Sequence, residues 1–104
     1  MISALEKLLG TPRDGALLRY SLGLEHAKAG NAERAAGYLR EAVARDPLYS
    51  AAWKALGKLL VELKKPEEAL EAYRKGIAAA EKKGDKQAGK EMAVYVRRLE
   101  KGGG

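Results

Sequence analysis

Two segments, Trp53-Lys54-Ala55-Leu56-Gly57 and Pro66-Glu67-Glu68-Ala69-Leu70-Glu71-Ala72-Tyr73-Arg74-Lys75, carry apolar residues at the three- and four-residue spacing of amphipathic helices. Pro66 suits the first position of the second helix, because the N–H that proline lacks would have no partner there. An earlier part of the chain repeats both segments after a shift of 34 residues. The aligned pairs are Leu22 with Leu56, Gly23 with Gly57, Ala35 with Ala69, Leu39 with Tyr73 and Ala42 with Gly76. The repeated unit is therefore a hairpin of two helices.

Helix-breaking residues divide the chain into amphipathic segments, and no stretch alternates like a strand. The helices expected from this pattern are 2–9, 15–29, 32–45, 51–64, 66–83 and 86–100. The polar residues expected to cap helix starts are Asp14, Asn31, Ser50 and Asp85. Because a lone hairpin cannot bury its apolar faces, neighbouring hairpins must stack. The predicted fold class is all-α, a short superhelix of helical hairpins.

The second unit resembles the tetratricopeptide repeat (TPR) family. Trp53-x-x-Leu56-Gly57 matches the family's W-x-x-L-G pattern, and Ala69-x-x-x-Tyr73 matches its A-x-x-x-F pattern. The resemblance implies one TPR-like domain over residues 1–101. Its expected parts are a capping helix at 1–10, repeats at 16–49 and 50–83, a capping helix at 85–101, and a disordered tail at 102–104.

The sequence departs from the family pattern at several positions. Arg19 replaces an expected aromatic residue, and His26 and Leu60 stand where the family often has Tyr, which suggests looser packing. Glu81 replaces a closing proline, which suggests that the helix continues to Lys83. At a constant shift of 34 residues, Lys90-Glu91 occupies the Leu-Gly position of a third unit. The last helix is therefore expected to be a solvating cap.

Composition argues against several classes of chemistry. The chain has 104 residues and no cysteine, which excludes disulfides and cysteine-ligated zinc. His26, the single histidine, lacks companions at ligand spacing and is expected to be packed. No phosphate-binding loop or Ser/His/Asp arrangement is present. We therefore expect no enzyme activity, no metal and no cofactor. The lack of a secretory signal and of a long apolar run favours a cytoplasmic protein without a membrane partner.

The resemblance implies a concave groove lined by the first helix of each unit. The residues expected to bind a partner there are Leu17, Tyr20, Ser21, Leu24, Lys28, Lys54, Lys58 and Glu62. Lys54 and Lys58 lie one helical turn apart, so both ammonium groups can reach one anion. They resemble part of the clamp with which some family members hold the C-terminal carboxylate of a partner peptide.

The expected function is a non-catalytic protein-interaction module that binds a peptide or partner segment in this groove. Two alternatives remain open. One is a homo-oligomerising scaffold subunit, such as a homodimer. The other, less favoured, is nucleic-acid binding through the second half. Residues 53–104 carry 13 Lys/Arg against 8 Asp/Glu, whereas residues 1–52 carry 7 against 6. The basic residues are not interleaved with aromatic side chains for base stacking.

Overall fold

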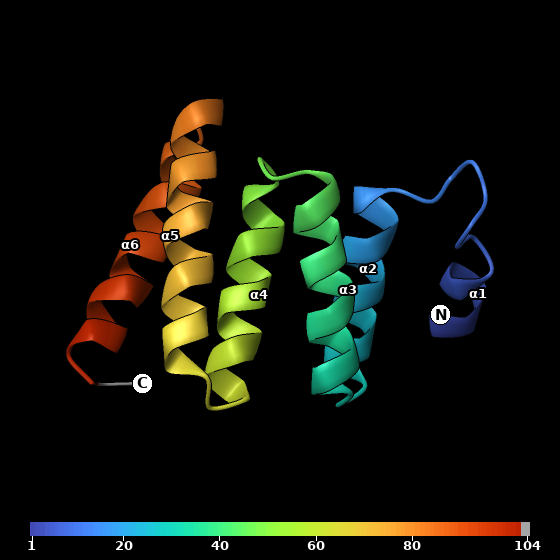
Figure 1. Cartoon of the computed structure of the whole chain (residues 1–104), viewed down its shortest axis with the longest axis horizontal. Helices are drawn as coiled ribbons and strands as arrows, with labels where there is room; N and C mark the ends of the chain where they lie inside the picture. The colour runs from blue at the N-terminus through green and yellow to red at the C-terminus, as the bar shows by residue number, and fades with distance from the viewer. Residues whose placement is uncertain (103–104) are drawn as a thin grey trace.

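The computed structural model describes residues 1–102, which form an all-α superhelix, as predicted. The helices are α1 (Ile2–Glu6), α2 (Ala16–Lys28), α3 (Ala32–Arg45), α4 (Ser50–Glu62), α5 (Pro66–Lys83) and α6 (Lys86–Glu100). They stand side by side in chain order, from α1 at one end of the molecule to α6 at the other (Figure 1). Residues 103 and 104 of the predicted tail lie outside the described part, and Gly102 follows α6 in a left-handed conformation.

Most predicted helix bounds agree with the structure within two residues, and α1 is the exception. It ends at Glu6 rather than at residue 9. The reason is that Leu8 and Leu9 donate to carbonyl oxygens three residues back, which tightens the chain into turns. The predicted extension of α5 to Lys83 is confirmed, and Gly84 ends this helix with a φ of 75°.

The helices form two layers. The hairpins α2–α3 and α4–α5 each pack internally, and α6 packs on α5. Along the stack, α2 contacts α4 and α4 contacts α6, whereas no backbone contact joins α3 to α5 within residues 1–102. The first helices of the hairpins therefore lie closer to one another than the second helices do. They form the inner layer, which is the concave side of a superhelix. We call α3 and α5 the outer layer.

Two glycines set the distance between the helices of each hairpin. A Cβ atom added to Gly23 would lie 2.7 Å from Cγ of Leu39, and one added to Gly57 would lie 2.6 Å from Cδ1 of Tyr73. A real side chain cannot occupy such space without displacing its neighbour. The glycines at positions 23 and 57 therefore allow the two helices of each hairpin to approach closely.

The last helix repeats the buried pattern of the first helices. Met92 is the seventh residue of α6, as Leu22 is of α2 and Leu56 is of α4, and all three are at most 3% exposed. Ala93 then takes the position of Gly23 and Gly57. The expectation that Lys90-Glu91 replaces the Leu-Gly pair is therefore wrong. Because α4 begins 34 residues after α2 (Ala16 to Ser50) but α6 begins 36 residues after α4 (Ser50 to Lys86), a constant shift of 34 misaligns α6 by two residues.

One of the four predicted N-caps forms. The Asp85 carboxylate accepts a 3.1 Å hydrogen bond from the Ala88 N–H at the start of α6. Asn31 occupies the N-cap position of α3 but makes no capping hydrogen bond, and the predictions for Asp14 and Ser50 are wrong. Asn31 directs its amide nitrogen to Nδ1 of His26 at 3.1 Å, Ser50 is the buried first residue of α4, and Asp14 binds Arg19.

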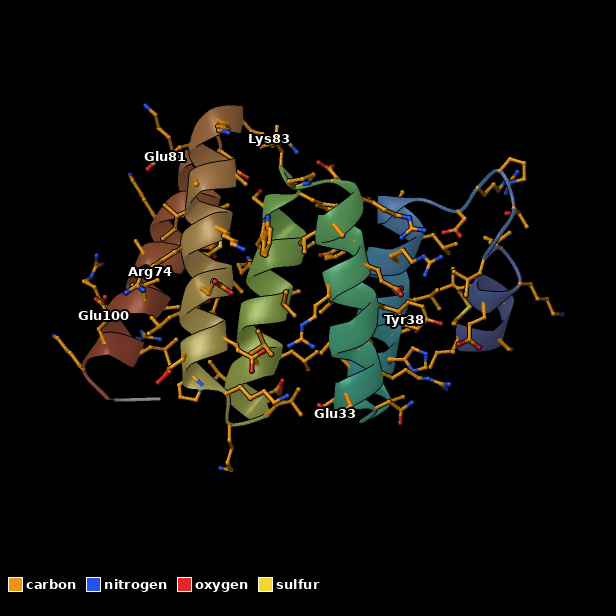
Figure 2. All side chains as sticks on the ribbon, viewed as in Figure 1. Glu33, Tyr38, Arg74, Glu81, Lys83 and Glu100 are labelled. Carbon is orange, nitrogen blue, oxygen red and sulfur yellow. The ribbon has the colours of Figure 1, made fainter. Side chains whose placement is uncertain are left out.

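His26 is packed, as predicted, and belongs to a polar cluster beneath α1. Its ring is 2% exposed and stacks on Tyr38 with centroids 5.4 Å apart. Tyr38 points toward α1 (Figure 2) and donates a 3.2 Å hydrogen bond to Glu6. The same Glu6 oxygen lies 3.5 Å from Nε2 of His26. These contacts attach the short first helix to α2 and α3, and aromatic stacking fills the site where looser packing was expected.

Arg19 also forms specific contacts instead of loosening the first unit. Its guanidinium donates to both carboxylate oxygens of Asp14, at 3.0 and 2.8 Å, and to Glu41 on α3 at 2.6 Å. Asp14 accepts a further bond from the Gly10 N–H. The arginine therefore ties the segment before α2 to the outer layer. The Arg19 hydrogen bonds, with that of Gly10, lower the pKa of Asp14 from 3.8 to about 2.

The Asp14 pKa gives an expected pH dependence of stability. A carboxyl whose pKa is lower in the folded state stabilises the fold above its unfolded pKa, and this contribution is lost as the pH falls through the folded value. We expect Asp14→Asn to be less stable than the parent at neutral pH, with a difference that narrows between pH 4 and pH 2. Urea unfolding at several pH values measures it. A difference that stays constant down to pH 2 would contradict the assignment.

Candidate functional site

The predicted groove residues of α2 differ in exposure along the inner layer, and Lys28 borders an open hollow between α1 and the end of α2. Leu17 is 68% exposed, and Lys28 forms an exposed 3.4 Å pair with Glu25. The half-buried Tyr20 ring lies 4.9 Å from the Tyr49 ring at the start of α4. The remaining two residues on α2, Ser21 and Leu24, are half-buried. Tyr20 thus helps join the two hairpins.

Lys54 and Lys58 of α4 were predicted to bind one anion together, but Lys54 forms an ion pair with α6. Nζ of Lys54 lies 3.3 Å from Oε1 of Glu91, which links α4 to α6 across the inner layer. An anion held jointly by Lys54 and Lys58 would have to compete with this carboxylate. Lys58 lies one turn after Lys54, and Glu62 lies one turn after Lys58. Both Lys58 and Glu62 are exposed.

Lys58 and Glu62 stand at the rim of a hollow of about 300 Å³ between α4, α5 and α6. We call it the concave hollow. Its residues are Lys58, Val61, Glu62, Tyr73, Tyr95, Arg98 and Leu99. The aromatic rings of Tyr73 and Tyr95 lie 5.3 Å apart and are tilted by 41°. Tyr73 is buried, Val61, Tyr95 and Leu99 are half-buried, and the three charged residues are exposed.

This arrangement places an apolar floor beneath a charged rim. Burial, with a smaller effect from Tyr95, raises the pKa of Tyr73 to about 12, so its phenol stays neutral at physiological pH. Two cations and one carboxylate surround the opening. Mostly apolar walls with a few placed polar groups are typical of surfaces that bind another molecule. The geometry suits one apolar side chain together with an adjacent acidic group.

Sequence reasoning missed the part of the hollow that α6 supplies, because a constant shift of 34 residues misaligns this helix and it was interpreted as a cap alone. Its signal was present: Tyr95 and Leu99 are one helical turn apart in the apolar stripe of the last helix. Arg98 is the thirteenth residue of α6, as Lys28 is of α2 and Glu62 is of α4. The residue thus occupies a position predicted to face the groove in both earlier hairpins.

Trp53 is not part of the concave hollow and lies between the two hairpins, beside the outer layer. Its Nε1–H donates a 2.8 Å hydrogen bond to the Pro47 carbonyl, and the Lys75 ammonium lies 5.8 Å from its ring centroid. The side chain is half-buried and packs against the core. Among residues 1–102, none of the helices combines the length and apolarity that crossing a bilayer requires.

Comparison with known proteins places the chain among repeat proteins of this shape. The sequence model of the tetratricopeptide repeat family matches residues 20–84. A TPR repeat-containing protein of Pseudomonas aeruginosa is 48% identical over 101 residues, which are 97% of this chain and 96% of the relative.

Two solved structures also match closely. The solution structure of a Bordetella parapertussis protein has a TM-score of 0.81 and 40% identity, over 97% of this chain and 88% of that one. The crystal structure of a tetratricopeptide repeat domain protein from Salinibacter ruber has a TM-score of 0.78 and 32% identity, over 84% of this chain and 97% of that one.

Proposed function

The chain belongs to the tetratricopeptide repeat family, whose members are generally non-catalytic protein-interaction modules, and we propose that its concave hollow binds a segment of a partner protein. The bound segment presents one apolar side chain to the floor and an acidic group to the rim. Binding of this kind requires shape and a few charges but no reactive group.

The observation that carries the proposal is the concave hollow itself. Side chains from three helices leave apolar surface open between the half-buried residues Val61, Tyr95 and Leu99. Lys58 and Arg98 place positive charge at the edge, which favours an acidic neighbour and speeds encounter with it. The α2 residues Leu17, Tyr20, Ser21, Leu24 and Lys28 extend the same inner layer and are proposed as weaker, flanking contacts. Lys54 contributes through its pair with Glu91.

The proposal is tested by selecting peptides that bind the full chain and then changing the rim. We expect selected peptides to combine an apolar residue with an acidic one. Arg98→Glu is expected to weaken binding about tenfold or more, because it removes an attraction and adds a repulsion. Fluorescence anisotropy of a labelled selected peptide measures the effect.

The matched control is Arg34→Glu, which makes the same charge change at an exposed position on α3. It should leave the affinity within about twofold of the parent, because charges beyond the Debye length are screened at physiological salt. Equal losses for the two variants would show that binding follows net charge and not the concave hollow. Circular dichroism confirms that both variants remain folded.

A further inference from the structure

The end of the superhelix formed by α5 and α6 is less covered than the equivalent surfaces inside the stack. Ile77 is the twelfth residue of α5 and is half-buried, whereas Val43, the twelfth residue of α3, is 6% exposed. Val96 is the eleventh residue of α6 and is half-buried, whereas Leu60, the eleventh residue of α4, is 2% exposed. Within residues 1–102 no helix follows α6 to cover Val96, and α6 contributes Gly89 to the groove in which Ile77 lies.

The uncovered surface includes an apolar groove of about 400 Å³ between α5 and α6. We call it the end groove. Its residues are Ile77, Ala80, Glu81, Gly84, Asp85, Lys86, Gly89, Lys90 and Ala93. Gly89 is the fourth residue of α6, the position that Trp53 holds in α4, so no bulky side chain fills the groove. Ala93 holds in α6 the position that Gly57 holds in α4. The Tyr73 ring of the following helix, α5, packs against Gly57. The groove is therefore shaped to receive a large side chain from a helix.

The ion pairs along the outer layer show which charges such a helix would carry. Arg40, the ninth residue of α3, pairs at 2.9 Å with Glu68 in the first turn of the following outer helix. Arg74, the ninth residue of α5, pairs at 2.6 Å with Glu100 of α6. Figure 2 shows this second pair at the edge of the molecule. Both of its side chains are at least half exposed, and such pairs contribute little, so another acidic residue can replace Glu100.

The exposed side of α6 carries a row of four cations beside the end groove, and these outnumber the two carboxylates, Glu81 and Asp85, in the groove's lining. Lys86, Lys90, Arg97 and Lys101 follow one another at spacings of four, seven and four residues, which places them on one helix face. A helix docked antiparallel to α6, as α5 is to α4, would begin near Arg97 and Lys101 and end near Lys86. Acidic residues along its polar side would meet this row of cations.

We infer that the end groove binds an acidic amphipathic helix of a partner protein, in the place that the outer helix of a third hairpin would take. The apolar side of that helix inserts a large residue over Ala93 and Gly89, and an acid in its first turn replaces Glu100 at Arg74. This surface is separate from the concave hollow, so the inference stands or falls independently of the proposed function.

The test uses a peptide built from the chain's own outer helix. The probe has the sequence of residues 66–83 with Lys75→Glu, Lys82→Glu and Lys83→Glu, and is titrated into the ¹⁵N-labelled full chain. We expect amide shift changes at Ile77, Gly89, Ala93 and Arg97. The chain variant carrying Arg97→Glu and Lys101→Glu is expected to bind about tenfold more weakly or worse.

Two controls separate docking from general charge attraction. A scrambled peptide of identical composition should bind much more weakly, because it lacks an apolar face. Charge reversal at the opposite end of the molecule, with Lys7→Glu and Arg34→Glu, should leave probe affinity unchanged. Equal binding of the scrambled peptide, shift changes confined to the concave hollow, or shifts that grow with protein concentration without the peptide would each overturn the inference. Tighter binding of a single-stranded oligonucleotide at the same amides would overturn it in favour of nucleic acid.

Discussion

Gly57→Ala is expected to destabilise the protein by about 1–3 kcal/mol, whereas Gly37→Ala is expected to stabilise it by about 1 kcal/mol. Both glycines lie inside helices, where alanine has the better intrinsic propensity. At Gly37 the added methyl group meets open space. At Gly57 it meets Cδ1 and Cζ of Tyr73 at 2.6 and 2.7 Å, and Tyr73 is only 2% exposed and cannot move aside freely. Because the two substitutions are expected to change stability in opposite directions, comparing them separates the effect of packing from that of helix propensity.

Urea unfolding of the two variants under the same conditions measures both free energies. The comparison needs no further control, because each variant changes the same atoms. Equal stabilisation by both substitutions would show that α4 and α5 do not approach as closely at Gly57 as the structure indicates. That result would also contradict the geometry described for the concave hollow, because Tyr73 lines it.

The larger effect is expected from truncation after Gly84, which removes α6. The shortened chain should lose cooperative unfolding and aggregate, because α6 buries Met92 against Gly76 and pairs Tyr95 with Tyr73. The free energy lost with several such contacts exceeds the free energy of unfolding of a small domain, which is about 5–15 kcal/mol. Thermal circular dichroism and size-exclusion chromatography measure the outcome. A soluble truncated chain with a sharp melting transition would contradict the packing described for α6.

A pair of point substitutions tests the same contact without removing the helix. Met92→Ala is expected to cost about 2–5 kcal/mol, because the methionine is fully buried. Gln87→Ala, on the exposed side of α6, should change stability by less than about 0.5 kcal/mol. Similar small losses for both would show that α6 is loosely attached.

The helical hairpins were predictable from the sequence because their signals are local and repeated. Apolar residues at helical spacing identify the helices, and Gly23 and Gly57, with their partners Leu39 and Tyr73, identify the pairing. Long-range polar contacts were not predictable in this way. Arg19 contacts both Asp14 and Glu41, and Glu6 contacts Tyr38, across separations that no helical period connects.

The candidate site was predictable in part. Lys58 and Glu62 were expected in the groove and line the concave hollow. Tyr95, Arg98 and Leu99 were missed, because a fixed shift of 34 residues misplaces α6 after the long helix α5. Counting from the start of each helix corrects the alignment and brings Arg98 level with Glu62. Lys54 was expected beside Lys58 as a joint anion site, but its pairing with Glu91 depends on how α6 packs and could not be seen in α4 alone.

The central claim is that partner segments bind in the concave hollow, and mapping a selected peptide onto the ¹⁵N-labelled full chain tests it most directly. Binding in the hollow predicts the largest amide shift changes at Lys58, Tyr95, Arg98 and Leu99, with loss of these changes in Arg98→Glu. Shift changes confined to α3 and the outer side of α5, with the concave hollow unaffected, would contradict it.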